Sequence, residues 1–203
     1  FLFLIIFILI SGSILILSTK GYETNKFNNL IENEISERNS NVELKLNKIK
    51  MKLNIKKFNL FLSSKRPELK YQEITIPILD FKIYINLISL LKSKPKIEEV
   101  FINLNDSKIT NLKKLVVRMK PSNYKRFMLN NLISGTIKSE ITLNFDENLN
   151  IDKFKVNGET KNLNIKIKKN VELDNARFVF NLSNEEFSAN FISGQFRGIK
   201  LKN

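Results

Sequence analysis

The sequence predicts a mainly β protein with a few helices (α+β). We expect an N-terminal transmembrane helix, then a curved antiparallel sheet forming an apolar-lined groove, with short helices at the membrane-proximal end. Residues 1–17 are almost wholly apolar, residues 42–62 alternate between apolar and polar, and residues 136–203 alternate again without a helical period. Alternation with a period of two places the apolar side chains on one face of a strand.

The first element, residues 1–20, is interpreted as a transmembrane anchor. It carries no charge before Lys20, and about 20 apolar residues are needed to cross a bilayer core. A cleaved signal peptide is the alternative, with a cleavage site at the small residues 11–13. The apolar run continues to Leu17, which favours the anchor. Because the chain does not begin with Met, we expect it to be part of a longer protein.

Residues 21–41 are predicted to be a juxtamembrane helix and linker. Phe27, Leu30, Ile31 and Ile35 fall at helical spacing. The segment ends in the turn-rich residues 38–41. Its expected role is to lead the chain from the membrane to the sheet.

Residues 42–134 are predicted to be a membrane-proximal β domain with capping helices. The alternation in residues 42–62 changes phase near Lys48 and again near Lys57. A change of one residue sends side chains to the opposite face unless a bulge or turn absorbs it. We therefore expect one long bent strand or a tight pair, followed by strands near residues 69–78 and 97–104.

Three helices are expected in the same domain. Residues 82–91 are apolar nearly all round, which is typical of a buried helix that would cover the first strands. Residues 109–119 carry a clean helical stripe, and Ser122 is a plausible N-cap for a helix over residues 123–132. The last two helices form either a lid or part of an ordinary core.

Residues 135–203 are predicted to be a meander of groove-forming strands. Turn signals, including Asn157-Gly158, separate the apolar runs. Nothing else in the chain is left to cover their apolar face, and a large uncovered apolar patch usually marks a binding surface. A groove and an ordinary core both remain open. The six expected strands lie near residues 137–145, 151–156, 163–167, 178–182, 187–191 and 196–201.

The composition argues against enzyme chemistry. The chain has no His and no Cys, which removes the commonest general base, thiolate metal sites and disulfides. A calcium-like alternation begins at Asp146, but Ile151 and Asn157 stand where that loop needs Gly and Glu. We therefore expect no enzyme, no catalytic residue, no cofactor and no metal.

The net charge of +14 suggests an anionic partner, either a phospholipid surface or nucleic acid. Lysines such as Lys50 and Lys52 form stripes along strands, yet the aromatic side chains alternate onto the opposite face, away from any base that would stack between the lysines. A membrane anchor also argues against nucleic acid, which we do not expect as a partner.

The order of elements resembles the N-terminal portion of the AsmA-like family, the AsmA, YhdP and TamB type of bridge-like lipid-transfer proteins. The resemblance lies in the membrane span, the short helix and long alternating strands, and in residues 63–71, 76–85 and 97–102. Residues 157–165 and 194–199 resemble its repeating strands. The resemblance implies a single-pass bacterial inner-membrane anchor, a periplasmic body with an apolar-lined groove, and phospholipid movement to the outer membrane. This chain departs from the family in being short.

The expected function is therefore lipid binding and transfer that supports envelope assembly, with phospholipid acyl chains and the membrane as partners. A membrane-tethered β-rich scaffold that binds envelope proteins is the alternative. An acyl chain needs an apolar floor without buried charge. The expected lining residues are Leu143, Phe145, Ile165, Ile167, Phe178, Phe180, Phe187 and Phe191.

Overall fold

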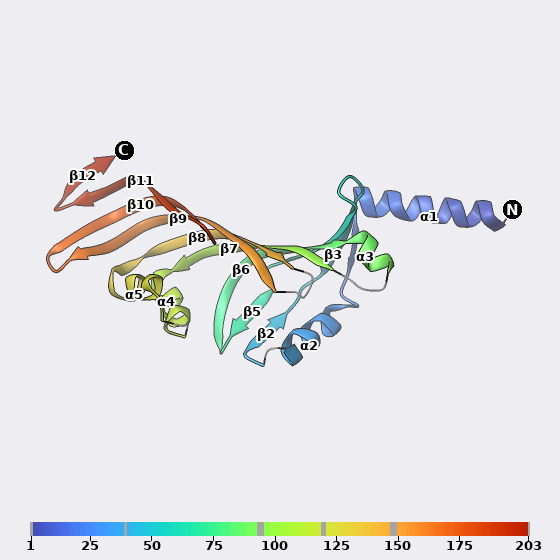
Figure 1. Cartoon of the computed structure of the whole chain (residues 1–203), viewed down its shortest axis with the longest axis horizontal. Coiled ribbons are helices and arrows are strands. Elements are labelled where there is room, and N and C mark those ends of the chain that lie inside the picture. The colour runs from blue at the N-terminus through green and yellow to red at the C-terminus, as the bar shows by residue number, and fades with distance from the viewer. Residues whose placement is uncertain (1, 39, 93–95, 119–120, 147–149, 203) are drawn as a thin grey trace.

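The computed structural model describes residues 2–38, 40–92, 96–118, 121–146 and 150–202. Over these residues the chain forms one curved, open antiparallel sheet of twelve strands with helices packed against one side (Figure 1). The predicted α+β class, with an apolar N-terminal helix, is confirmed. The elements are α1 Leu2–Thr19, β1 Tyr22–Thr24, α2 Asn28–Arg38, β2 Val42–Lys45, β3 Ile49–Asn54, β4 Asn59–Lys65, β5 Glu68–Tyr71, β6 Ile74–Asn86, α3 Leu87–Leu91, β7 Ile97–Lys108, α4 Ile109–Val117, α5 Asn123–Asn130, β8 Leu132–Phe145, β9 Ile151–Lys168, β10 Val171–Ser183, β11 Phe187–Phe196 and β12 Ile199–Lys202.

The sheet follows the chain order closely. Its strands lie in the order β1, β3, β4, β6, β7, β8, β9, β10, β11 and β12, while β2 pairs with β5 and β5 with β6 at one side. The boundary expected between residues 134 and 135 falls inside β8, and β8 pairs with β7 as well as with β9. The sheet therefore continues without interruption across that position.

The register gathers the apolar side chains on one face, because directly paired residues of neighbouring strands point to the same side. We call this side the apolar face and the opposite side the outer face. One row of paired residues crosses eight strands: Ile49, Ser64, Phe81, Ile102, Ile141, Val156, Leu182 and Phe187. A parallel row crosses six strands: Met51, Leu62, Ile83, Val100, Leu143 and Phe154.

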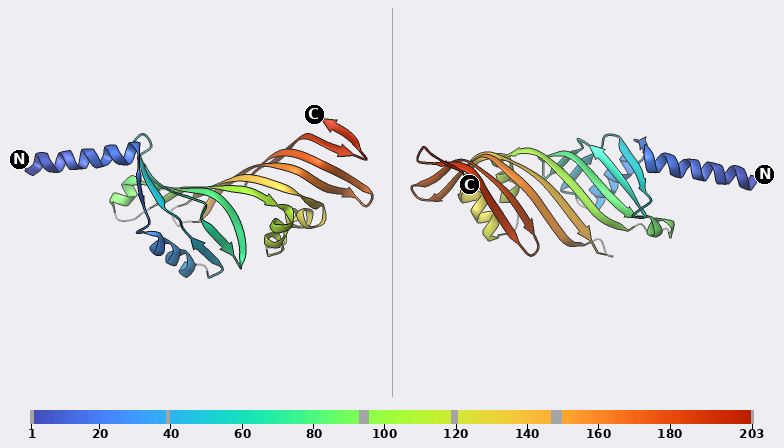
Figure 2. Two further views of the ribbon diagram at one scale, coloured as in Figure 1. Left: turned by 180° about the vertical axis from the view of Figure 1, so that it is seen from behind. Right: turned by 90° about the horizontal axis from the view of Figure 1, so that it is seen from above.

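Helices cover the apolar face at two places. Near the N-terminal end, Ile31 and Ile35 of α2 pack on the buried Leu44, Leu46 and Ile49. Farther along the sheet, α4 and α5 pack over a second cluster formed by Ile109, Leu132, Leu163 and Ala176. Both layers lie on the same side of the sheet (Figure 2).

The prediction of a helix over residues 82–91 is wrong, because strand β6 runs to Asn86 and only residues 87–91 of this segment are helical, as α3. The segment is apolar on both sides because the outer face also carries aromatic residues here. Tyr84 lies 5.7 Å from Phe61 between ring centroids, and the Lys82 ammonium lies 5.5 Å from the Phe101 ring centroid. Apolar residues on two faces of a strand imitate a buried helix.

The phase changes in residues 42–62 mark the ends of strands. Lys48 lies between β2 and β3, and Lys57 lies in the turn between β3 and β4. Of the two alternatives, the tight pair is correct for β3 and β4, which form a hairpin. The juxtamembrane helix begins only at Asn28, because β1 precedes it and pairs with β3.

Two of the six strands expected after residue 135 are one strand. Asn157-Gly158 was predicted to be a turn, but both residues lie inside the 18-residue strand β9. The apolar residues change from even to odd positions because of an irregularity near Asn162, whose φ is 50°. A bulge of this kind resets the alternation without ending the strand.

The second cluster gives a direct test of the fold. Ile109 is 0% exposed, so Ile109→Ala should lower the free energy of unfolding by about 2 to 5 kcal/mol, because it leaves a cavity. Chemical denaturation in a mild detergent measures the change. Val117→Ala in the same helix is the control, since Val117 is exposed, and it should change stability by no more than about 0.5 kcal/mol. Equal effects of both variants would contradict this packing.

Candidate functional site

All eight side chains expected to line a groove lie on the apolar face. Leu143 and Phe145 come from β8, Ile165 and Ile167 from β9, Phe178 and Phe180 from β10, and Phe187 and Phe191 from β11. Ile165 and Phe178 lie against the second cluster, under α4 and α5. The structure therefore brings the eight together on one surface, and their role as a lipid lining stays a prediction.

Much of this surface is accessible to solvent. Ile151 is 56% exposed and Phe187 is 54% exposed. The other six members of the set below are half-buried. Neither hydrophobic cluster contains these residues. We call the following set the open apolar face: Leu143, Phe145, Ile151, Phe154, Val156, Phe180, Leu182 and Phe187.

Ile151, Phe154, Val156 and Leu182 were not among the expected lining residues. Phe154, Val156 and Leu182 carry the same alternation as the residues that were selected, and this signal was available in the sequence. Ile151 is out of phase with Phe154, and only a register shift places it opposite Phe145. The alternation along one strand does not show which residues of neighbouring strands are paired. Only the register shows that Val156 lies between Ile141 and Leu182 in a single row.

Two glycines let aromatic rings lie close to the sheet. A Cβ atom on Gly158 would lie 2.2 Å from the Phe180 ring, and one on Gly194 would lie 3.1 Å from the Phe191 ring. Phe191 also meets Phe178 edge to face, with 5.4 Å between ring centroids. Gly158 is therefore used for close approach of a side chain, as glycines inside strands often are.

Irregularities in β7 to β11 bend the sheet near the second cluster. The register shifts between Leu104 and Ser107, between Ser134 and Thr136, and between Ala176 and Val179. Side chains satisfy the backbone there: the Asn175 N–H donates to Asn164 Oδ1 at 2.9 Å, and the Phe178 N–H donates to Thr160 Oγ1 at 2.9 Å. Such bulges increase twist and bend a strand, which curves the sheet around its apolar side.

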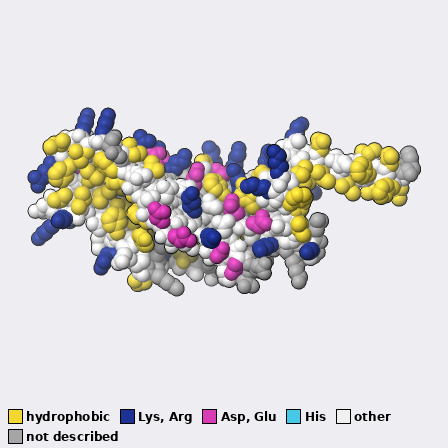
Figure 3. All heavy atoms as spheres, turned by 45° about the horizontal axis from the view of Figure 1, so that its top comes forward, with side chains coloured by type: hydrophobic (Ala, Val, Ile, Leu, Met, Phe, Trp, Pro, Cys, Tyr) yellow, Lys and Arg dark blue, Asp and Glu magenta, His cyan; other side chains and the backbone are white. Residues whose placement is uncertain are grey.

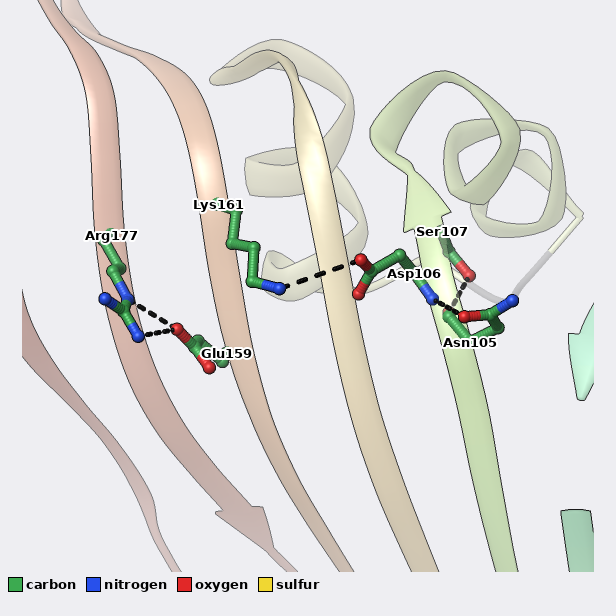
Figure 4. Close-up of polar contacts among 6 residues, drawn as sticks. All are labelled: Asn105, Asp106, Ser107, Glu159, Lys161 and Arg177. Atoms are coloured by element: carbon green, nitrogen blue, oxygen red, sulfur yellow. Dashed lines mark hydrogen bonds and ion pairs between the residues drawn. The ribbon is translucent and has the colours of Figure 1, made fainter. Parts of the chain in front are cut away.

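The outer face carries the charges. Arg177 binds Glu159, and the Lys161 ammonium lies 3.8 Å from the Asp106 carboxylate (Figure 4). Exposed pairs of this kind add little stability, so their main effect is to keep this side soluble. Burial, and then the charge of Glu99, raises the pKa of the Tyr84 phenol, which keeps that group neutral.

The distribution of side-chain types can be followed on the surface. In Figure 3 hydrophobic side chains gather over the C-terminal strands, while charged side chains dominate the central part of the body in the same view. The hydrophobic α1 stands at the opposite end. α5 also contacts the sheet through Tyr124, whose ring centroid lies 6.4 Å from that of Phe187.

In the part of the chain that the structure describes, one helix is long and apolar enough to cross a membrane. This is α1, whose 18 residues carry no charge and none of which is buried by the rest of the chain. A signal sequence meets the same criterion of length and composition. Among the residues that the structure describes, no group of three or more Asp and Glu side chains is placed to hold a metal ion.

Comparison of the chain with protein-family models, with curated proteins and with solved structures gave no match. The site must therefore be interpreted from its own chemistry. Its features are an accessible apolar surface on a curved sheet, charges restricted to the opposite face of the paired rows, and an apolar helix at one end.

The contact between Gly158 and Phe180 can be tested by a double-mutant cycle. Gly158→Ala should destabilise the protein by about 1 to 3 kcal/mol, because the added methyl group overlaps the ring. In a Phe180→Leu background the same substitution should cost less, and denaturation measures both. Additive effects would show that the ring does not lie over Gly158.

Proposed function

We propose that this chain is a membrane-anchored lipid-binding protein whose open apolar face holds phospholipid acyl chains. The observation that supports it most strongly is the part of the long row from Ile102 to Phe187, which crosses five strands without a polar member. The row has no charged side chain. An apolar track of this kind suits an acyl chain.

The dimensions of the track fit this ligand. Neighbouring strands lie about 4.8 Å apart, so the part of the row from Ile102 to Phe187 spans roughly 19 Å over four gaps. One leaflet of a bilayer core is about 15 Å thick, half of the total. An extended acyl chain can therefore lie across the strands along this part of the face.

The energetics favour the same ligand. Each methylene group removed from water contributes up to about 0.8 kcal/mol. An unpaired charge on the track would cost several kcal/mol, and the paired rows hold none among the described residues. Binding of this kind needs no catalytic residue and no cofactor.

The position of α1 supports membrane attachment. α1 leads into the edge strand β1 and projects from the N-terminal end of the sheet, roughly along the long axis of the molecule (Figure 1). The apolar rows cross the strands in the same general direction. With α1 in a membrane, the rows would lead away from the bilayer.

The proposed setting is the bacterial inner membrane, with a single pass and the bulk of the chain in the periplasm. There the protein would support phospholipid movement toward the outer membrane and envelope assembly, in the manner of the AsmA-like proteins that the sequence resembles. A scaffold whose apolar face is closed by an envelope protein is the competing function. The experiment that follows separates the two.

Phe180→Asp should abolish lipid that co-purifies with the full chain in mild detergent, because it places a charge on the open apolar face. Native mass spectrometry measures the bound lipid. The matched control is Val179→Asp, since Val179 is 39% exposed and lies on the outer face next in sequence. This control should keep its lipid.

Both variants must retain the far-ultraviolet circular dichroism spectrum of the parent chain. Lipid that persists in Phe180→Asp would contradict the proposed site. A parent chain that carries a stoichiometric protein partner and no phospholipid would favour the scaffold.

A further inference from the structure

The turn between β3 and β4 exposes apolar side chains that no packing explains. It covers residues 55–58, where Ile55 is 50% exposed and Phe58 is 60% exposed. The turn is ordered by its own hydrogen bonds: the Lys57 N–H donates to Asn54 Oδ1 at 3.2 Å. Phe58 has a φ of 49°, a conformation that is uncommon for a bulky residue. A strained and exposed Phe suggests a functional role.

Helix α3 lies beside this turn and adds to its surface. The Leu87 N–H donates to the Phe58 carbonyl at 3.0 Å, which joins the start of α3 to the turn. Ile88 and Leu90 are exposed as well. We call Ile55, Phe58, Ile88 and Leu90 the tip surface.

The register places the tip surface next to the end of α1. β1 follows α1 directly and pairs antiparallel with β3, with Tyr22 opposite Met51. β3 therefore runs back toward α1, and the turn that follows it reaches the last turn of that helix. In Figures 1 and 2 the turn after β3 lies beside the C-terminal end of α1.

Lysines outnumber acidic residues around the tip surface, where Glu98 accepts from the Asn86 side chain at the start of α3 and Glu23 pairs with Lys50. Lys56 and Lys57 precede Phe58 in the turn, Lys92 follows α3, and Lys20 follows α1, and all four are exposed. Residues 52–58 and 87–92 contain no Asp or Glu. Exposed apolar side chains surrounded by lysines are typical of segments that lie in the interface of an anionic membrane.

The tip surface also continues into the apolar face. Leu53 and Leu60 form the second-last pair of the β3–β4 hairpin before the turn, and Leu60 pairs with Ile85. These residues extend the rows described above.

We propose that the tip surface inserts into the headgroup region of a bilayer that contains anionic phospholipid. This proposal rests on the membrane attachment of α1 proposed above, but not on lipid binding by the distant strands. The membrane is favoured over a protein partner because the candidate span ends at the same place and the four lysines match an anionic headgroup layer. The insertion would fix the orientation of the sheet relative to the bilayer.

The absence of Trp from the sequence allows a clean test. The full chain is reconstituted as Phe58→Trp, Leu9→Trp or Val179→Trp into vesicles with brominated acyl chains. The vesicles contain phosphatidylcholine alone, or equal parts of phosphatidylcholine and phosphatidylglycerol. The proposal predicts strong quenching for Phe58→Trp in the anionic vesicles, at least twofold less in the neutral ones, and none for Val179→Trp in either.

Charge reversal provides the matched control. Lys56→Glu together with Lys57→Glu, in the Phe58→Trp background, should reduce quenching in anionic vesicles to the level of the neutral ones. Leu9→Trp reports insertion of α1 separately. Quenching at Leu9→Trp without quenching at Phe58→Trp would overturn the tip proposal and leave the anchor intact. Quenching at Phe58→Trp that is equal in both kinds of vesicle would also overturn it, whereas quenching at Phe58→Trp alone would support the tip and contradict the anchor.

Discussion

The cross-strand register is the constraint on which the rest of this structure depends. Apolar residues alternate along most of the long strands, so a shift of one residue in the pairing of a strand would send its apolar side chains to the outer face. The pairings of Ile141 with Ile102 and Val156 keep one side apolar across the sheet. Where the alternation changes phase, a bulge near Asn162 or a turn at Lys57 absorbs the change.

A one-sided sheet needs a second layer, and the chain supplies it only in part. α2 covers the N-terminal end, and α4 with α5 covers the region of Leu132 and Leu163. The remaining strands keep phenylalanine and isoleucine side chains accessible, which is unusual for a soluble surface of this extent. This incomplete cover is the physical basis of the proposed lipid site, and the charged side chains keep the outer face hydrated.

The sequence predicted the fold where one period was unambiguous. The predicted positions of two helices agree closely with α4 and α5. The apolar stripe indicated α4, and the N-cap at Ser122 indicated α5, since the Ser122 hydroxyl accepts from the Lys125 N–H at 3.1 Å. The prediction failed where a local pattern had a different structural cause. Tyr84 made β6 resemble a helix because it packs on Phe61, and Gly158 imitated a turn because it makes room for Phe180. The eight expected lining residues share a face, but pairings between strands were needed to add Phe154 and Val156.

The central claim is that phospholipid acyl chains occupy the open apolar face of this protein in living cells. Photo-crosslinking with p-benzoylphenylalanine tests it most directly, in place of Phe154 on the apolar face or of Lys155 on the outer face. Mass spectrometry of the purified protein then identifies the adducts. The account predicts phospholipid adducts at position 154 and none at position 155. Protein adducts alone at position 154, or equal lipid labelling at both positions, would contradict it.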